Sequence, residues 1–242
     1  MSAVAVVIPA LDEEASIGAL IGEMPRDIVR AVIVVDNGST DATAARARAA
    51  GAIVVAEPER GYGRAVAAGI RSVPEWAEIV VFLDGDGSDN PTSIAALVAP
   101  IESGAADFVL GTRTRGTRDA GSLSLLQIAA GRFAGLCLRI LYGVEFTDMS
   151  PFRAVRKRSL DKLAMTEMTY GWNLQMMMLA ARDGLRIREI AVHSRTRSGG
   201  VSKVSGNWQV VAIAGFRILS VLARTALPLR QPRTARTLEK VQ

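Results

Sequence analysis

Short runs rich in Val and Ile alternate with helix-like segments through the first part of this chain. The apolar runs AVAVVIPA, AVIVVDNG, AIVVAEP and IVVFLDGD occupy residues 3–10, 31–38, 52–58 and 79–86. The segments between them, which show helical spacing, occupy residues 13–25, 41–51 and 63–74. Strands that are apolar on both faces and are separated by helices indicate a mostly parallel sheet covered on both sides. The pattern therefore predicts a Rossmann-like α/β fold, in which ligands bind at the carboxyl ends of the strands.

The second half begins with a further predicted strand, at 107–113, and then carries two long apolar segments. Residues 123–142 and 208–224 each gather their polar residues on a narrow stripe, which is typical of amphipathic helices. We expect neither to span a membrane, because Arg interrupts each and the longest uncharged stretch is shorter than the roughly 20 residues a bilayer requires. The expected divisions are a main domain over 1–206, an amphipathic helix over 207–226 and a mobile basic tail over 227–242.

The chain carries a formal net charge of +5, and its arginines lie in clusters. These clusters occupy residues 113–118, 153–158, 182–197 and 224–236. Aromatic residues make up only 5% of the chain and do not interleave with the clusters, which argues against a nucleic acid partner. The phosphate groups of a small ligand, or the anionic surface of a membrane, fit this distribution better.

Cys137 is the single cysteine of the sequence, so an internal disulfide is excluded. A chain of 242 residues can bury a stable core without a disulfide or a structural metal. The N-terminal sequence MSAVAVVIPALDEE has no basic leader and no small-residue cleavage site, and it fits the first strand of the fold. We therefore expect a reducing, cytoplasmic compartment.

Two carboxylates, Asp84 and Asp86, directly follow a predicted buried strand and are spaced by glycines at 85 and 87. Carboxylate oxygens at this spacing can reach one hard cation such as Mg²⁺ or Mn²⁺. An acidic turn without a ligand is the alternative, since Asp-Gly is a common turn signal. The preceding strand favours the metal site.

The neighbouring predicted strand ends in VVDNGSTDAT, residues 34–43. Asp36 at the strand end can accept hydrogen bonds from a nucleobase or a ribose, and we expect it to contact a ligand. Ser39, Thr40 and Asp41 fit a turn and a helix cap without a ligand role.

Five motifs occur in the order seen in one enzyme family. They are IPALDEE, VVDNGSTD, RGYGRAVAAGI, FLDGDGSDNP and RTRSGGVSK, and they extend from about residue 4 to residue 206. With them the chain resembles the GT-A, family 2 glycosyltransferases, and within these the bacterial relatives of polyprenyl-phosphate sugar synthases. The resemblance implies an inverting transfer of a sugar from a UDP- or GDP-sugar with Mg²⁺ or Mn²⁺.

The resemblance also assigns residues to the donor. Pro9, Asp12, Glu13 and Asp36 would line the nucleotide pocket, and Asp84, Gly85 and Asp86 would meet the metal and the diphosphate. Gly61 and Arg64 would lie in a loop that approaches the donor. The residue types support this assignment, because glycines let the backbone approach a ligand and Arg64 is at a helix start that favours phosphate binding. A glycine-rich loop with an exposed Arg is the alternative.

A late basic segment, HSRTRSGGVSK at 193–203, combines Arg195, Arg197 and Lys203 with two glycines. Arginine forks suit phosphate oxygens, and the glycines permit a loop that closes over a bound donor. A solvated basic loop is the alternative. By the same resemblance His193 is a candidate metal ligand, although a lone histidine at a strand end is more often exposed or hydrogen-bonded.

Arginines also flank the first amphipathic segment, at Arg113, Arg115, Arg118 and Arg132. In the resembled synthases, basic residues in this region hold the acceptor phosphate beside helices in the membrane interface. We therefore assign Arg113 and Arg132, with Asp86, to catalysis, and expect peripheral contact with the inner face of the cell membrane. Packing of these helices on the core, or in a homo-oligomer, is the alternative.

The chain departs from the family pattern at two positions. Asn37 replaces a second carboxylate, and Gln175 stands where relatives often carry an acid. An amide cannot act as a general base, but an ionised phosphate acceptor needs none. For a hydroxyl acceptor the nearest acids in sequence are Asp148 and Glu167. A soluble transferase with a small hydroxyl acceptor, and a weakly active protein that binds nucleotide sugars as a scaffold, therefore remain alternatives.

Overall fold

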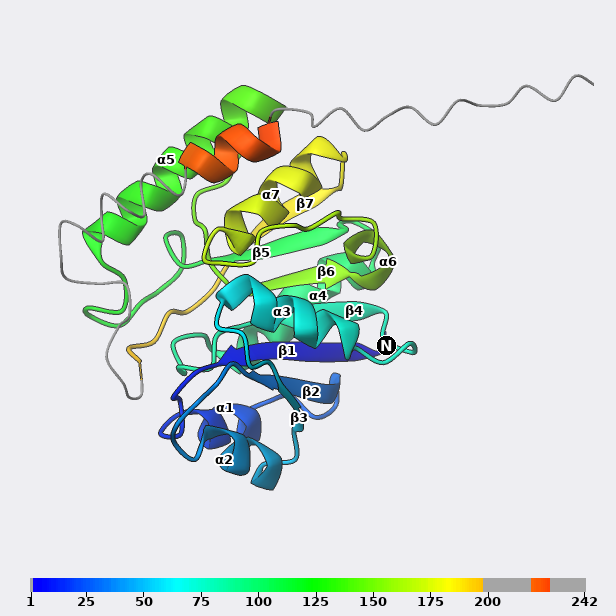
Figure 1. Ribbon diagram of the computed structural model, residues 1–242. Helices are drawn as coiled ribbons and strands as arrows, with labels where there is room; N and C mark the ends of the chain where they lie inside the picture. The colour runs from blue at the N-terminus through cyan, green and yellow to red at the C-terminus, as the bar shows by residue number, and fades with distance from the viewer. Residues whose placement is uncertain (1, 198–218, 227–242) are drawn as a thin grey trace, which may run out of the picture.

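The computed structural model of the chain describes residues 2–197 and 219–226 (Figure 1). Its centre is a seven-stranded sheet in the order β3-β2-β1-β4-β6-β5-β7. The strands are β1 (Val4–Ala10), β2 (Val29–Asp36), β3 (Ile53–Ala56), β4 (Ile79–Phe82), β5 (Phe108–Thr112), β6 (Arg153–Arg156) and β7 (Ile187–Ala191). The five strands expected from the sequence are β1 to β5, and the predicted α/β class is confirmed.

Most neighbouring strands are parallel, with β6 as the exception. Parallel pairing joins β1 to β2 and β4, β2 to β3, and β5 to β7. Strand β6 runs antiparallel to both β4 and β5, and its first residue Arg153 lies opposite Phe82 and Leu110. The carboxyl ends of β1, β2 and β4 therefore lie at one edge of the sheet, next to the start of β6.

Helices cover both faces, because alternate strand residues point to opposite sides. Val4, Val6 and Ile8 pack with α1 (Ile17–Gly22), α2 (Thr43–Ala49) and α4 (Ile94–Glu102), which follows the short 3-10 helix η1 (Pro91–Ser93). Ala5 and Val7 pack on the other side with α3 (Tyr62–Arg71), α5 (Leu125–Tyr142) and α7 (Trp172–Arg182). The short helix α6 (Lys157–Leu160) follows β6. Met176, Met177 and Met178 are fully buried in this second layer, as core residues rather than as a binding feature.

Helix α5 is the predicted amphipathic helix of 123–142, and it lies beside α7 at the outside of the domain (Figure 1). Ser124 and Gln127 form a capping box at its start, and Gly143 ends it with φ +70°. Its buried side is made of Gly131, Ala134, Gly135 and Leu138. By length and hydropathy alone α5 would qualify as a membrane span, but this buried side packs on the domain.

The second predicted amphipathic helix is described only at its end. Residues 219–226 are helical and lie beside α5, with Val221 and Leu222 buried in the core (Figure 1). Gly171 accommodates Val221, since a Cβ there would lie 2.5 Å from Val221 Cγ2. The rest of the segment 207–226, and the predicted tail 227–242, lie outside the described residues.

Candidate active site

Three carboxylates gather just after β4. Asp89 folds back so that its carboxylate accepts a hydrogen bond from the Asp84 backbone N–H at 3.2 Å. The Ser88 N–H donates to the Asp86 carboxylate at 2.9 Å, and Gly87 adopts φ +76°, which suits glycine. Asp86 and Asp89 are buried. The segment DGDGSD is therefore a tight turn that concentrates negative charge at the carboxyl edge of the sheet.

Burial disfavours the ionised form of two of these carboxylates. Burial, together with the charges of Asp86 and Asp89, raises the pKa of Asp84 to about 8. Burial also raises the pKa of Asp89 to about 7, although the nearby Arg113 opposes that rise. Carboxylates with raised pKa values would be stabilised in their ionised form by a bound cation.

The chemistry of Asp84 and Asp86 fits Mg²⁺ or Mn²⁺, which prefer oxygen ligands. Within the described residues, no group of three or more His, Cys, Asp or Glu side chains is arranged to hold a metal ion. The two carboxylates would therefore bind a cation together with oxygens from a ligand or from water. The His193 side chain contacts the loop after β5, with Nδ1 2.9 Å from Thr117 Oγ1 and Nε2 3.4 Å from Asp119 Oδ1. Its backbone runs along the carboxylate turn, since Ser194 forms a bridge with Asp89 and the Arg195 N–H donates to the Ser88 carbonyl at 2.9 Å.

Two residues that the sequence did not single out lie near Asp84. The hydroxyl of Tyr62, the first residue of α3, donates to Asp84 Oδ1 at 3.1 Å. Arg153 is fully buried at the start of β6, and its guanidinium donates to the backbone carbonyls of Ser150, Pro151 and Asn173. Burial lowers the pKa of Arg153 to about 10, so it remains a cation at neutral pH close to the carboxylates.

Arg113 is held next to the same turn by Asp148. Its Nε and Nη2 donate to the two carboxylate oxygens at 2.9 and 2.8 Å, and its backbone N–H donates to Oδ2 at 2.9 Å. Burial alone would raise the pKa of Asp148, but the hydrogen bonds and charge of Arg113 hold it below its usual range. Arg113 is thus a rigid cation beside Asp84 and Asp89, as the influence of its charge on both carboxyl groups indicates.

The residues expected to line the nucleotide pocket lie where β1 and β2 end. Asp12 adopts φ +53°, and its carboxylate accepts a hydrogen bond from the Thr40 N–H at 2.8 Å. The Asp36 carboxylate accepts from the Ser39 N–H at 2.9 Å, which closes the turn after β2. Pro9 lies in β1 next to this edge, and the Gly85 carbonyl accepts from the Ser16 hydroxyl at 2.8 Å. The turns after β1, β2 and β4 are therefore joined to one another.

Gly61 and Gly63 lie against the backbone of the loop 165–171, which precedes α7. A Cβ on Gly61 would lie 2.6 Å from the Met168 carbonyl oxygen, and one on Gly63 would lie 2.4 Å from that of Glu167. These glycines therefore admit neighbouring backbone in the protein itself. The Arg64 N–H donates to the Met168 carbonyl at 3.1 Å, while its side chain pairs with Glu59 at 2.6 Å.

Gln175 fastens this loop rather than facing a ligand as a free amide. It is buried, and its Oε1 accepts hydrogen bonds from the backbone N–H groups of Thr166 and Glu167 at 2.9 and 2.8 Å. Its Nε2 donates to Thr166 Oγ1 at 2.8 Å.

Arg197 brings the late basic segment to the carboxylate turn. Its Nη2 donates to Glu13 Oε1 at 2.8 Å, and its Nε lies 3.3 Å from Asp86 Oδ2. Arg195 lies farther out, with contacts to Glu23 at 2.5 Å and to Asn90 at 2.7 Å. Lys203 falls outside the described residues, and Arg132 is exposed on α5.

Three functional candidates were absent from the sequence-based assignment. Asp89 belongs to the same run as Asp84 and Asp86, so its position after the turn was a usable signal. Tyr62 lies in the motif RGYGRAVAAGI, directly after Gly61, so its position next to the predicted donor loop was also a usable signal. Arg153 could not be found in this way, because an Arg in a short strand gives no sign of complete burial.

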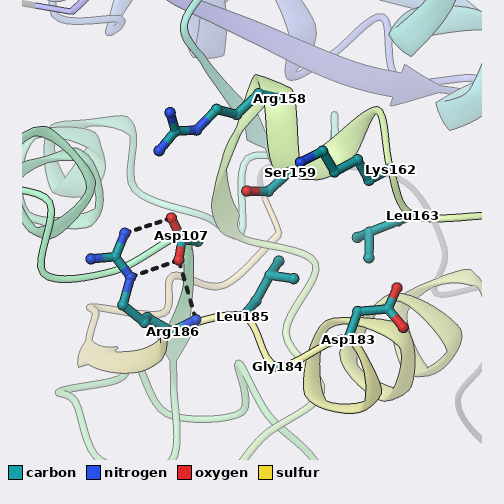
Figure 2. A pocket seen from close by; sticks show the side chains of 9 residues that line it. All are labelled: Asp107, Arg158, Ser159, Lys162, Leu163, Asp183, Gly184, Leu185 and Arg186. Atoms are coloured by element: carbon teal, nitrogen blue, oxygen red, sulfur yellow. Dashed lines mark hydrogen bonds and ion pairs between the residues drawn. The ribbon is translucent and has the colours of Figure 1, made fainter.

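A separate pocket of about 480 Å³ lies at the opposite edge of the sheet (Figure 2). It is lined by Asp107, Arg158, Ser159, Lys162, Leu163, Asp183, Gly184, Leu185 and Arg186. Asp107 precedes β5 next to the end of β6, and Arg156 of β6 pairs with Ile79 at the start of β4. The pocket is therefore remote from the carboxyl edge, and we do not assign the donor to it.

Comparison with known proteins links this arrangement to one family. The family described as "Glycosyl transferase family 2" matches residues 5–164. An uncharacterized glycosyltransferase of Mycobacterium tuberculosis is 36% identical over 218 residues, which cover 88% of this chain and 96% of the relative. The undecaprenyl-phosphate mannosyltransferase of Micrococcus luteus is 31% identical over 213 residues, which cover 83% of this chain and 86% of that enzyme.

A solved structure shares the fold. It is glucosyl-3-phosphoglycerate synthase of Mycobacterium tuberculosis in complex with Mn²⁺, UDP-glucose and phosphoglyceric acid. The likeness has a TM-score of 0.73 at 25% sequence identity, and it covers 93% of this chain and 80% of that one. The predicted GT-A fold is thereby confirmed.

Proposed function

The chain belongs to the family 2 glycosyl transferases, and on that premise we propose that it transfers a sugar from a UDP- or GDP-sugar to a polyprenyl phosphate. The transfer inverts the anomeric centre and takes place at a membrane surface. Two relatives support this acceptor class, since one is an undecaprenyl-phosphate mannosyltransferase and another a polyprenol monophosphomannose synthase.

The carboxylate turn after β4 is the observation that carries the proposal. Asp84 and Asp86 lie at the carboxyl edge of the sheet, where α/β folds bind ligands, and burial raises the pKa of Asp84 to about 8. Arg197 contacts Asp86 in this turn and Glu13 in the segment after β1. An anionic diphosphate bound with a divalent cation would satisfy both the carboxylates and the arginine.

On the donor side, the residues of the chain bind the diphosphate and hold it in place. Mg²⁺ or Mn²⁺ on Asp84 and Asp86 would offset the charge that develops on the departing diphosphate. Arg197 would exchange its contacts with Asp86 and Glu13 for diphosphate oxygens, and Arg64, Arg195 and Lys203 would add positive charge. Groups fixed in this way before the reaction stabilise the transition state without reorganising. Asp12 and Asp36, with Pro9, would hold the nucleoside.

On the acceptor side, Arg113 would bind the lipid phosphate. The Asp148 contacts occupy two of the five N–H groups of its guanidinium and hold it rigid. Arg132 would reach the same phosphate or its lipid neighbours from α5. The acceptor oxygen then attacks the anomeric carbon from the side opposite the diphosphate.

The state of the candidate bases favours a phosphate over a hydroxyl acceptor. Asp148 is bound to Arg113, and the Glu167 carboxylate accepts hydrogen bonds from the backbone and side chain of Thr169. Gln175 cannot accept a proton and fastens a loop. An ionised phosphate needs none of them, because it is already a nucleophile.

Helix α5 supplies a surface suited to a membrane. Its exposed side carries the apolar residues Leu125, Leu126, Phe133, Leu136 and Ile140. Arg132 and Arg139 lie beside this apolar stripe, where they can meet anionic headgroups. We propose that this surface holds the enzyme at a membrane, and we expect that membrane surface to be the inner face of the cell membrane.

Thermal-shift measurements with a panel of UDP- and GDP-sugars test the donor site. We expect one nucleotide sugar to raise the unfolding temperature only when Mn²⁺ or Mg²⁺ is present. Asp84→Ala and Asp86→Ala should abolish this stabilisation. If both variants still bind the donor as the wild type does, the assignment of the carboxylate turn is wrong.

Transfer assays then test the acceptor. Sugar from the selected donor should become extractable with polyprenyl phosphate into organic solvent. Transfer to a small hydroxyl compound instead would support a soluble transferase. Donor binding without transfer to any acceptor would support a scaffold protein.

A further inference from the structure

The contact between Tyr62 and Asp84 gives one carboxylate oxygen of the proposed metal site a fixed partner. The Tyr62 hydroxyl donates to Oδ1 at 3.1 Å, across two segments that are 22 positions apart in the chain. Residues that hold a metal ligand through a hydrogen bond fix its orientation, and their loss typically weakens metal binding by 10–100-fold.

The Tyr62 side chain is itself held on several sides. Its ring stacks on that of Tyr170, with centroids 6.4 Å apart and planes inclined by 25°. Gly61 and Gly63, on either side of it, are pressed against the backbone of the loop 165–171. The hydrogen bond from the Arg64 N–H to the Met168 carbonyl ties the same loop to the start of α3.

Gln175 links this loop to α7. Its side chain accepts from the N–H groups of Thr166 and Glu167 and donates to the Thr166 hydroxyl. A continuous series of contacts therefore runs from α7 through Gln175, the loop 165–171 and Tyr62 to Asp84. Gln175 lies at the far end of this series.

We propose that Tyr62 is a positioning residue: it holds Oδ1 of Asp84 and so leaves Oδ2 oriented for the cation and the donor diphosphate. Gln175, by fastening the loop 165–171, keeps Tyr62 in place. The inference rests on the proposed function, because it assigns a role within the same donor site.

Tyr62→Phe is the direct test, since it removes the hydroxyl and keeps the ring that stacks on Tyr170. The probe is the affinity for Mn²⁺ in the presence of saturating UDP or GDP, whichever stabilises the wild type. It is measured from the electron paramagnetic resonance signal of free Mn²⁺. We expect about tenfold weaker Mn²⁺ binding. In transfer assays the KM for Mn²⁺ should rise, while kcat at saturating Mn²⁺ stays within about twofold.

Tyr142→Phe is the matched control. The Tyr142 hydroxyl is buried without a hydrogen-bond partner among the described residues, so its removal should leave Mn²⁺ affinity unchanged. Gln175→Ala should weaken Mn²⁺ binding in the same direction as Tyr62→Phe. Gln175→Glu should restore it to within about twofold, because a carboxylate can still accept from both loop N–H groups. This Gln175 pair also replaces Tyr62→Phe if that variant fails to fold.

The outcomes separate the two proposals. Wild-type protein that binds no nucleoside diphosphate in a metal-dependent way overturns the proposed function, and the positioning role with it. Metal-dependent binding that is equally strong in wild type and Tyr62→Phe overturns the positioning role alone. An equal loss in Tyr62→Phe and Tyr142→Phe overturns it too, because the effect would then not depend on Asp84.

Discussion

Asp148 holds the Arg113 side chain in place through its carboxylate. Its carboxylate is buried and compensates most of the charge of Arg113. Asp148→Asn removes this compensation and leaves a buried guanidinium. We expect the free energy of unfolding to fall by about 3 kcal/mol and the KM for the lipid phosphate to rise. Urea unfolding and steady-state kinetics measure the two effects.

The double variant Arg113→Gln, Asp148→Asn serves as the control for this prediction. It removes the buried guanidinium that Asp148→Asn leaves without its carboxylate partner, so part of the lost stability should return. A double variant that is no more stable than Asp148→Asn alone would contradict the explanation.

Asp107, at the opposite edge of the sheet, makes a pH-dependent contribution to the free energy of unfolding (Figure 2). Hydrogen bonds from Arg186, with the charges of Arg186 and Arg156, lower the pKa of Asp107 to about 2. A lowered pKa in the folded state contributes stability above the unfolded pKa of about 4, and this is lost as pH falls towards 2. The free energy of unfolding of the wild type should therefore be higher than that of Asp107→Asn by about 1 kcal/mol at pH 7, since solvent screens the exposed Arg186. Urea unfolding at several pH values should show the difference vanishing near pH 2, and a constant difference would refute it.

The sequence predicted the residues at the strand ends better than their partners. Asp12, Asp36 and Asp84 could be assigned to one edge because parallel strands bring their carboxyl ends together. The contact of Arg113 with Asp148 joins residues 35 positions apart, and no local pattern predicts it. His193 illustrates the same limit, since its neighbours Thr117 and Asp119 come from a distant loop.

At the level of elements, the start of α3 and the loop 165–171 depend on two small residues. A Cβ at Gly63 would lie 2.4 Å from the Glu167 carbonyl oxygen, so Gly63→Ala must displace the loop. We expect a loss of about 2 kcal/mol or more in the free energy of unfolding, measured by urea titration.

Gly18→Ala is the matched control in another helix. Gly18 lies within α1, and a Cβ there would have no heavy atom within 4 Å. Because alanine favours helix over glycine, this variant should gain up to about 1 kcal/mol. If the Gly63→Ala variant were as stable as the wild type, the loop would not be closely packed on α3.

The first five strands could be predicted because each is a short run rich in apolar residues, although β3 at the edge of the sheet is only partly buried. Strand β6, with the sequence RAVR, was missed since it has only four residues and an arginine at each end. Strand β7, IREIA, also mixes charged and apolar residues and is only partly buried. The apolar pattern also could not predict the strand order. Strand β6 lies between β4 and β5 and pairs with both, although it follows them in the sequence.

At the scale of the whole molecule, the proposed membrane contact rests on the exposed apolar side of α5. We expect purified protein to float with anionic vesicles, less at high salt, because Arg132 and Arg139 contribute by charge. Leu136→Glu, at a residue 54% exposed on α5, should abolish flotation. Ile53→Glu, at a residue 50% exposed on β3, should not. Equal flotation of both variants would exclude α5 as the membrane-binding surface.

The position of β6 in the sheet also affects how the protein emerges from the ribosome. Strands β1 to β4 are neighbours and are translated first, so they can pair while synthesis continues. Strand β5 has only β6 and β7 as neighbours, and it leaves the exit tunnel before either. At roughly 5–20 residues per second, the nascent chain waits several seconds between the appearance of β4 and that of β6. During this interval the edges of β4 and β5 are exposed, and a chaperone that binds nascent chains would find them there.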